Sequence, residues 1–425
     1  MNDARRRLLS NVMSLGAVQI FSYLLPFLSL PYLARNLGAN ELGRMAFALS
    51  IAQIFVIFTD YGFNLSGPKA IALAKGQKED ITAIWCVVTW LRTIFAIAGL
   101  ALLTMLLPWW QAIREDWDLI YIAYLLVVGN VIFPQWLFQG LEALRFVSIV
   151  QIGARLLVFA ATFCVVHHPT DVRLATALQA LGPLLGGILT LPHTLRSLSA
   201  SQIKLPTKSF MLYHLREGWH IFMSTAAINI YTSCNSFMLG LFVQPSTLGH
   251  YHVAEKLCKA VQMALSPISN AVYPVISRLA AENQQAVLKF NRKLLLIMGG
   301  GSLTISVAIS GMAHLIVREL FGDGYGEATL LLQIMAYLPF LIAMSNVLGI
   351  QTMIPLGFKQ AFSKILITAA AIDLLIFTPA VFFGGAQGAA WTNVMVELFV
   401  TLSMAYSLHR SGLGLIPFPS RSRHP

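Results

Sequence analysis

The sequence contains few charged residues for its length. Asp, Glu, Lys and Arg make up 11% of its 425 residues, whereas hydrophobic residues make up 57% and the mean hydropathy is +0.70. Soluble domains contain about 25% charged residues, because charged side chains cover the surface that faces water. The composition therefore excludes an ordinary cytosolic enzyme and indicates a membrane protein.

The sequence also lacks the usual motifs of catalysis and cofactor binding. Its cysteines (Cys86, Cys164, Cys234 and Cys258) lie far apart in apolar stretches, with no CxxC or metal-ligand spacing, so we predict small buried hydrophobic side chains. There is no GxxxxGK[ST], GxSxG or HExxH pattern in the chain. We therefore expect no nucleotide, metal or other cofactor, and no enzymatic activity.

Long apolar stretches, in contrast, are abundant. A helix needs about 20 mostly apolar residues to cross the hydrocarbon core of a membrane. Such stretches recur along the whole chain with short polar gaps between them, and they predict about 12 spanning helices. The expected spans are 11–35, 42–66, 82–107, 118–140, 146–167, 172–196, 214–243, 247–275, 287–312, 326–352, 361–383 and 386–409.

The longest gap between expected spans, residues 197–213, lies near the middle of the chain. It is rich in serine and falls between the sixth and seventh spans, so we interpret it as a linker between two halves. The predicted fold is an all-α polytopic membrane protein with two six-helix bundles, formed by residues 1–200 and 201–425, around a central cavity. No room remains for a separate soluble domain.

The net charge of +11 is explained by the positions of the cations. With the N-terminus inside, the inner loops and termini hold 20 of the 29 Lys and Arg residues, the outer loops hold five, and four are intramembrane. Because cytoplasmic loops are enriched in Lys and Arg, both termini are predicted to be cytoplasmic. The same distribution argues against nucleic acid as a partner.

The two halves share a weak internal repeat. The stretch Glu41-Leu-Gly-Arg-Met-Ala-Phe-Ala48 aligns with Thr247-Leu-Gly-His-Tyr-His-Val-Ala254 at an offset of 206 residues. Each stretch opens the second span of its half. An offset of six spans preserves the orientation, so we expect parallel repeats related by an axis along the membrane normal.

Four ionisable residues are expected near the middle of spans: Arg92, Arg155, Asp373 and Glu397. Each costs roughly 2.5–3.5 kcal/mol at the centre of a membrane helix, so each must face a water-filled cavity or pair with another charge. One interpretation is structural ion pairs that tie helices together. The other is a path for a substrate or an ion.

Polar stripes at helical spacing favour the second interpretation, a path for a substrate or an ion. Residues three or four apart share one helix face, and stripes of this density suit a cavity, although Ser and Thr also join membrane helices. Asp60, near the inner end of the second span, fits either a structural anchor or a functional group. The stripes are Ser148, Gln151 and Arg155; Thr225, Asn229, Thr232 and Ser236; His252, Lys256, Lys259, Ser266 and Asn270, beside Glu255; and Asn393, Glu397 and Thr401.

Two parts of the chain resemble a known family. The stretches Pro31–Gly38 and Thr59–Ser66 are similar to the N-terminal signature of Wzx-type polysaccharide flippases, which belong to the multidrug/oligosaccharidyl-lipid/polysaccharide exporter superfamily. The stretches Tyr231–Asn235 and Leu248–Lys256, followed by two prolines, resemble that family's seventh and eighth spans. The likeness extends over nearly the full chain, since span count, linker and repeat agree.

The resemblance implies a transporter of the bacterial inner membrane whose cavity opens alternately to either side. Its substrate would be an undecaprenyl-diphosphate-linked oligosaccharide repeat unit for O-antigen or exopolysaccharide assembly, with membrane lipids around it. A polysaccharide polymerase and a chain-length regulator are candidate partners that the sequence leaves open.

Roles for the intramembrane residues follow from their expected depth, since the matched motifs do not include all of them. A diphosphate needs cations and sugars need hydrogen-bonding groups. We expect Glu397 to exchange a proton or Na⁺ with support from Asp373, and Asp60 and Glu255 to be structural or gating residues. The expected substrate-binding residues are Arg92, Arg155, Lys256, Lys259, Asn229 and Asn270.

Three alternatives remain at this point. A multidrug or cation antiporter of the same superfamily would have a similar span count, but such proteins typically have an acidic first bundle, and both mid-span charges of the first half are arginines here. A membrane-embedded polysaccharide polymerase or ligase usually needs a large outer loop, which this sequence lacks. A structural scaffold would leave the mid-span charges unexplained.

Overall fold

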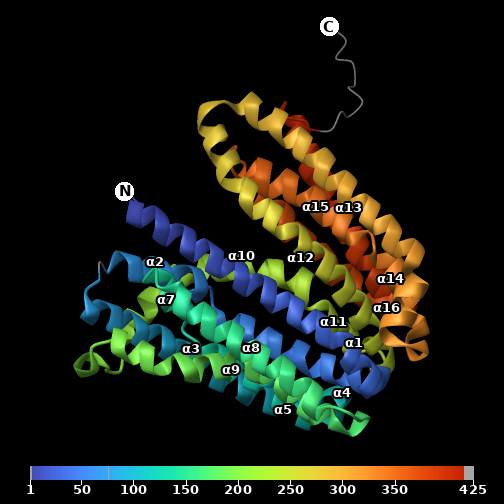
Figure 1. Ribbon diagram of the computed structural model, residues 1–425, viewed down its shortest axis with the longest axis horizontal. Helices are drawn as coiled ribbons and strands as arrows, with labels where there is room; N and C mark the ends of the chain where they lie inside the picture. Colours follow the sequence, from blue (N-terminus) through green and yellow to red (C-terminus); the bar gives the residue numbers. More distant parts are fainter. Residues whose placement is uncertain (1, 75, 416–425) are drawn as a thin grey trace. The chain divides into compact units, whose positions relative to one another are not determined.

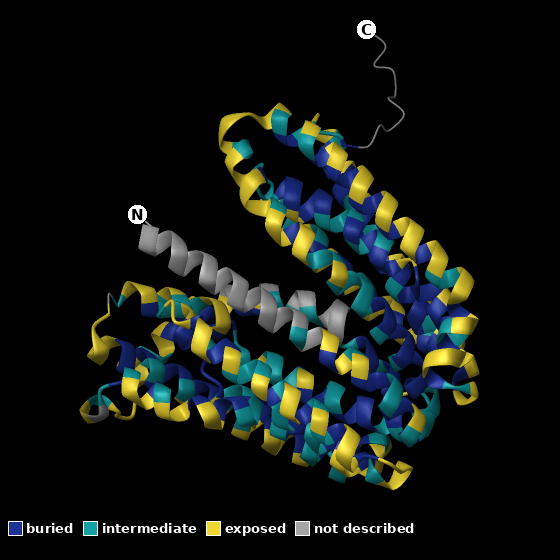
Figure 2. Ribbon diagram, viewed as in Figure 1, coloured by how far each residue is buried: buried dark blue, intermediate teal, exposed yellow. Residues whose placement is uncertain are grey.

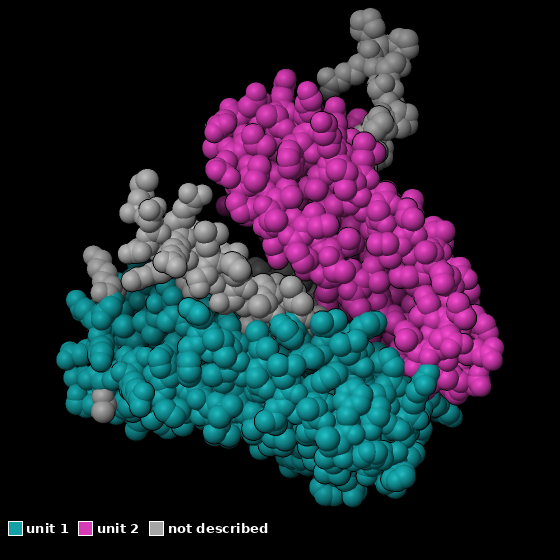
Figure 3. All heavy atoms as spheres, in the orientation of Figure 1, with its two compact units in different colours: residues 1–249 teal, residues 250–425 magenta. Residues whose placement is uncertain are grey.

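The computed structural model describes residues 2–74 and 76–415, and over these ranges the chain forms helices without strands. The side chains of residues 2–20, 22–23, 200, 220–221, 224, 227–228 and 230–233 are outside the description, and Thr232 of the third polar stripe falls among them. The chain divides into two compact units, Met1–Gly249 and His250–Pro425 (Figure 3). The division into bundles at residues 200 and 201 stays a prediction.

Unit 1 holds the helices of the first half and two from the beginning of the second half (Figure 1). The next helix, α12 (Pro245–Glu282), starts in unit 1 and continues into unit 2. The helices of unit 1 are α1 (Asn2–Asp60), α2 (Phe63–Leu73), α3 (Lys78–Leu106), α4 (Gln111–Glu115), α5 (Trp117–Ala123), α6 (Leu125–Ile132), α7 (Gln135–Gly140), α8 (Leu144–Val165), α9 (Val172–Ser197), α10 (Lys208–Ser233) and α11 (Asn235–Gly240), with short 3₁₀ turns at Pro169–Asp171 and Ala200–Gln202.

Unit 2 consists of the rest of α12 and four further helices. A 3₁₀ turn (Asp323–Tyr325) precedes the shorter pair, and a π-helical turn (Gly349–Met353) follows it. The helices are α13 (Gln284–Phe321), α14 (Gly326–Met335), α15 (Leu338–Leu348) and α16 (Lys359–Arg410).

The two longest helices are each two segments joined at a glycine. A straight helix of the 59 residues of α1 would be about 90 Å long, three times the hydrocarbon core of a bilayer. Gly38 (φ 75°) breaks α1, and Gly385 (φ 54°) breaks α16. Glycine adopts these positive φ values readily because it has no Cβ. Both breaks fall at or beside the gaps that the sequence predicts between spans, while the total of twelve spans stays a prediction.

Eight helical segments of the described chain are long and apolar enough to cross a membrane. Their outward faces carry large apolar side chains: Leu375, Phe382 and Phe383 of α16 are 75%, 76% and 86% exposed. Figure 2 shows such exposed positions along the outer sides of the helices in both units. Exposed apolar surface of this extent would be unstable in water and suits contact with lipid. The protein is therefore a multi-pass α-helical membrane protein, as the composition predicts.

Several expected spans are interrupted helices rather than continuous ones. The stretch 118–140 forms α5, α6 and α7, with Pro134 directly before α7, because proline cannot donate the hydrogen bond that would continue α6. The second span stops at Asp60, where Tyr61 and Gly62 both have positive φ, and continues as α2. The stretch 326–352 likewise forms α14, α15 and a π-helical turn.

The backbones around the two repeat glycines, Gly43 and Gly249, are in contact, and the contacting residues all belong to unit 1. A methyl group on Gly43 would overlap the carbonyl oxygen of Pro245, and one on Gly249 would overlap the carbonyl oxygen of Ala39. Gly249 is the repeat equivalent of Gly43, and Pro245 is the equivalent of Ala39, at the same offset of 206. The contact is therefore reciprocal, as expected at a pseudo-two-fold axis. Glycine is required at both positions because the backbones touch.

Candidate functional site

The first intramembrane charge, Arg92, lies in an ion pair. It extends from the middle of α3, is 3% exposed, and its Nη2 lies 3.5 Å from Oδ1 of Asp60 at the end of α1. Its Nε and Nη1 have no hydrogen-bond partner within the described part of the chain. The break between α1 and α2 brings Asp60 to the level of Arg92. The sequence singled out both residues, but it did not indicate that they meet.

This pairing predicts that Arg92 matters for stability. Replacing Arg92 by methionine leaves Asp60 without its cation, and breaking a buried pair costs about 3–5 kcal/mol. We expect a loss of stability at the lower end of this range, because the Asp60 side chain is 24% exposed. Thermal unfolding in detergent should therefore occur at a clearly lower temperature in Arg92→Met. The double variant Asp60→Asn/Arg92→Met should recover most of the loss. Equal loss in both variants would contradict the pairing.

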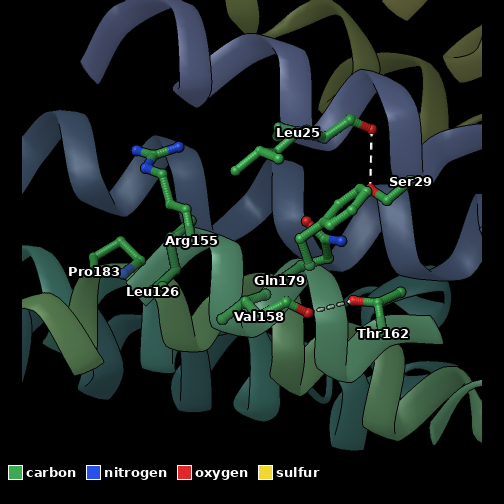
Figure 4. A pocket seen from close by; sticks show the side chains of 11 residues that line it. Leu25, Ser29, Leu126, Arg155, Val158, Thr162, Gln179 and Pro183 are labelled. Atoms are coloured by element: carbon green, nitrogen blue, oxygen red, sulfur yellow. Dashed lines mark hydrogen bonds between the residues drawn. The ribbon is translucent and has the colours of Figure 1, made fainter. Parts of the chain in front are cut away.

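The second arginine, Arg155, lines a cavity of about 160 Å³ between α1, α6, α8 and α9 (Figure 4). The hydroxyls of Ser29 and Thr162 on its wall donate to backbone carbonyls of their own helices. The side-chain N–H groups of the wall belong to Arg155 and Gln179. At about 30 Å³ per water, the space equals about five water molecules. A space of this size admits a phosphate-sized anion.

The lysines of α12 lie beside a buried carboxylate in unit 2. Nζ of Lys259 donates to Oε1 of Glu255 at 2.7 Å, and the Glu255 side chain is 10% exposed. Lys256 lies near enough to Glu255 to interact with it electrostatically. The cluster thus holds two cations and one anion. Glu255 neutralises Lys259, so the pair leaves the charge of Lys256 as the excess.

Asp373 is the most completely buried charge-bearing group among the residues whose side chains are described. It lies in the first segment of α16, is 0% exposed, and neither carboxyl oxygen has a hydrogen-bond partner among the described residues. Its neighbour Tyr251 is also fully buried and accepts a hydrogen bond from Nδ2 of Asn393 at 2.6 Å. Burying an ionised carboxylate without partners costs several kcal/mol. Asp373 therefore needs a proton or a bound cation.

Glu397, in the second segment of α16, has a different environment. Oγ of Ser345 in α15 donates to its Oε1 at 2.6 Å, and the residue is 8% exposed. Thr401, one turn further, donates to the carbonyl oxygens of Leu341 and of Glu397 itself. The stripe of Asn393, Glu397 and Thr401 thus faces the interior of unit 2, as its spacing predicts. Glu397 is held by a hydrogen bond, whereas Asp373 is not.

The two asparagines expected to bind substrate are less prominent. Nδ2 of Asn229 in α10 donates to the carbonyl oxygen of Thr225 in its own helix. Asn270 of α12 is exposed, and the adjacent Ser269 is the buried one. Ser269 donates to Asn346 at 2.6 Å and accepts from Gln351 at 2.7 Å.

That buried network extends further and was missed by the sequence analysis. Asn291 of α13 donates to the backbone oxygen of Gln351 at 2.8 Å and to Thr352 at 3.0 Å. These residues join α13 to the π-helical turn, where an extra residue per turn frees backbone groups for side-chain partners. No polar stripe at helical spacing indicates them, because the network depends on the irregular turn.

Charged residues also meet at the helix ends. Nε of Arg44 donates to Oδ1 of Asp116 at 2.5 Å, and its Nη1 donates to Glu41 at 2.8 Å. Burial raises the pKa of Asp116, whereas the hydrogen bond and the charge of Arg44 oppose that rise. His250, the repeat equivalent of Arg44, contacts Glu327 in unit 2. The cation count assigns Arg44 to an outer loop, whereas His250 and Glu327 fall within the expected spans 247–275 and 326–352.

Charged side chains buried inside a multi-span helical scaffold are typical of membrane transporters. The chain belongs to the polysaccharide biosynthesis protein family, whose family model matches residues 8–280. It is 32% identical over 406 residues to a protein of Escherichia coli (strain K12) named "Putative O-antigen transporter", covering 95% of this chain and 97% of that one. A Shigella dysenteriae protein of the same name is 30% identical over 397 residues, covering 93% and 98%.

Solved structures of low sequence identity share the fold. An inward-facing multidrug resistance MATE family transporter of the MOP superfamily aligns with a TM-score of 0.67 at 14% identity, covering 94% of this chain and 98% of that one. The lipid II flippase MurJ, in an inward closed conformation, also gives 0.67 at 12% identity, covering 92% and 86%. The resemblance to polysaccharide flippases that the sequence motifs indicate is confirmed by the family model and the relatives, and the all-α polytopic membrane fold is confirmed as well.

Proposed function

We propose that the protein is a flippase that moves a lipid-linked oligosaccharide from the inner to the outer leaflet of the bacterial inner membrane. The observation that carries this proposal is the presence of cations inside an apolar helical scaffold of the polysaccharide biosynthesis family. The names of the relatives, and the similarity of the fold to a lipid II flippase, support it. The protein would carry out no bond-breaking step.

The finer identity of the substrate follows from charge. We infer an undecaprenyl-diphosphate carrier, because a diphosphate bears about two negative charges that must cross a region of low dielectric. Arg155 fits this role because it lines the cavity, and Lys256 fits it because the α12 cluster holds one cation more than Glu255 can neutralise. Arg92 is paired with Asp60, and Lys259 is paired with Glu255. The Arg155 cavity suits one phosphate group, so the sugars would need a wider conformation of the transporter.

Ion coupling would depend on the two buried carboxylates of α16. We infer that Asp373 carries a proton or cation during the cycle, with Glu397 in the supporting position. This reverses the roles expected from the sequence, because Asp373 is fully buried without a donor and Glu397 accepts from Ser345. A carboxylate that is buried in one conformation needs a bound proton or cation there, and it can release that ion in another conformation in which water reaches it. Such a change in ion affinity can link transport to an ion gradient.

The orientation and the partners belong to the same proposal. Both termini would be cytoplasmic, because the inner loops carry 20 of the 29 Lys and Arg residues. Export of completed repeat units would bring the outer face close to a polysaccharide polymerase and a chain-length regulator. The lipid-linked oligosaccharide would reach them directly from the outer leaflet.

Deletion of the gene in its own host tests the function. The proposal predicts loss of surface polysaccharide together with accumulation of lipid-linked oligosaccharide that remains inaccessible to reagents outside spheroplasts. Expression of the protein from a plasmid should reverse both effects. Normal surface polysaccharide in the deletion strain, or a precursor that accumulates on the outer leaflet, would contradict a flippase. The second result would favour a polymerase or ligase.

A further inference from the structure

The internal repeat places different residues at one equivalent position of the two halves. Arg44 in the first copy corresponds to His250 in the second, one residue after the glycines whose backbones touch. Each residue lies near the start of the second span of its half, at the end that the cation count assigns to the periplasm.

In the first half, Arg44 fastens α1 to the segment between α4 and α5. Its guanidinium donates to Asp116 at that segment and to Glu41 on its own helix. Arginine is charged at every physiological pH. This contact, which we call the first clamp, therefore keeps its cation whatever the surrounding pH.

In the second half, His250 fastens α12 to the start of α14. Its Nδ1 lies 3.0 Å from Oε2 of Glu327, and its Nε2 lies 3.2 Å from the carbonyl oxygen of Gly324. Glu327 is the first acidic residue of α14, as Asp116 is the acidic residue directly before α5. The contact of His250 with Gly324 and Glu327 is the second clamp.

The second clamp needs one additional proton. A neutral imidazole has one N–H group and one nitrogen that can only accept. Gly324 offers an acceptor to Nε2, and an ionised Glu327 offers an acceptor to Nδ1, so both contacts are satisfied only by the doubly protonated ring. The alternative is a neutral ring that accepts from a protonated Glu327, and it requires the same additional proton.

We propose that His250 is a proton-binding site whose occupancy holds the outer end of α12 to α14. A conformation that binds a proton more tightly is favoured as the pH falls. Binding of the added proton therefore closes the second clamp and its loss releases it, whereas the first clamp keeps its cation. Protons of the outer compartment would thus act on one half only. The Glu327 side chain is 74% exposed, so protons from solvent reach the pair.

The surroundings of His250 contain few other charges. The ring of Tyr325 meets it edge-on at 5.6 Å between centroids. Asp323, at the start of the same 3₁₀ turn, faces Arg318 of α13 at 3.6 Å. On α12 itself the next titratable side chains are Tyr251, which bonds to Asn393, and His252. Glu327 is thus the carboxylate that contacts the ring among the described residues.

The charge of the ring can be measured directly. Full-length protein labelled with ¹⁵N-histidine in lipid bilayers gives separate signals for neutral and doubly protonated rings, and the difference from His250→Gln assigns one of the ten histidines. We expect two N–H groups on His250 at pH 6 in the wild type, and loss of one of them at the same pH in Glu327→Gln. A singly protonated ring at pH 6 in the wild type would overturn the proposal.

Hydrogen exchange tests the coupling to conformation and needs no transport substrate. We expect the amides of residues 322–327 to exchange about tenfold faster at pH 8 than at pH 6, after correction for intrinsic rates, because one net hydrogen bond is worth about a factor of ten. The amides of residues 322–327 should be protected from exchange at both pH values in His250→Arg and at neither pH value in His250→Gln.

The first clamp supplies the matched control. Arg44→His should transfer the pH dependence to residues 111–116 and leave residues 322–327 as in the wild type. If His250→Arg and His250→Gln keep the wild-type pH dependence, His250 is not the responsible group and the proposal fails. These readouts are independent of the cargo, so they stand apart from the test of the flippase function.

Discussion

Replacing Arg155 by alanine is expected to reduce oligosaccharide export by roughly a hundredfold while the protein stays folded in the membrane. Arg155 supplies the cationic wall of the cavity between α1, α6, α8 and α9. Removing a charged hydrogen-bonding partner from a buried anion costs about 2–5 kcal/mol, and 2.7 kcal/mol is a factor of about 100. Surface polysaccharide and membrane protein level, measured in the same cells, separate a transport defect from a folding defect.

Two variants make this result specific. Arg155→Lys keeps the charge but loses the planar fork, so we expect partial export. Arg173→Ala removes another arginine of unit 1, whose side chain is 71% exposed and paired with Asp118. An exposed ion pair contributes about 0–1 kcal/mol, so this variant should export normally. Normal export by Arg155→Ala, at wild-type protein level, would remove Arg155 from the proposed path.

The second large effect is expected at Asp373. Asp373→Asn should abolish the response of transport to an imposed pH or Na⁺ gradient, because an amide of the same shape cannot take up a proton or replace a carboxylate charge. Proteoliposomes with opposite gradients provide the measurement. We expect gradient-dependent transport in the wild type and gradient-independent, slow transport in the variant.

Glu397→Gln is the matched comparison. Its amide oxygen can still accept the hydrogen bond of Ser345, so we expect a smaller change than in Asp373→Asn. A full response in Asp373→Asn with none in Glu397→Gln would return the carrier role to Glu397. A full response in both variants would show that coupling uses other residues.

The sequence predicts the class of fold well because bilayer thickness limits the length of apolar segments. The polar gaps after residue 35 and after residue 383 correspond to real breaks at Gly38 and Gly385, since a helix that crosses twice must turn between crossings. The breaks at Tyr61 and Pro134 were not predicted as ends of helices. Both lie inside expected spans, where hydropathy does not report a change of backbone direction.

The candidate site was predicted residue by residue, but not as a set of contacts. Helical spacing indicated correctly that Asn393, Glu397 and Thr401 share a face. It could not indicate that Arg92 meets Asp60, because the break after α1 decides which carboxylate reaches α3. It also selected Asn270 instead of the buried Ser269, since adjacent positions differ by 100° around a helix and a short stripe leaves that choice open.

The repeat contained more information than its few identities suggested. Its offset of 206 residues relates Gly43 to Gly249 and Arg44 to His250. In the structure each glycine packs against the backbone of the other copy, and Arg44 and His250 each contact a carboxylate of their own half. Small residues are required where two helix backbones touch, which explains why the glycines are shared. The Arg-to-His difference has no such steric origin, and its consequence is the proton-dependent clamp proposed for the second half.

Flipping by the purified protein tests the central claim most directly. Proteoliposomes would contain a short lipid-linked oligosaccharide with a diphosphate carrier, and an impermeant enzyme or lectin outside would report the fraction in the outer leaflet. The proposed function predicts that wild-type protein makes the inner pool accessible within minutes. With Arg155→Ala protein, and in protein-free liposomes, the inner pool, about half of the total lipid-linked oligosaccharide, should stay protected. An inner pool that stays protected with folded wild-type protein, with and without an imposed ion gradient, would contradict the flippase assignment.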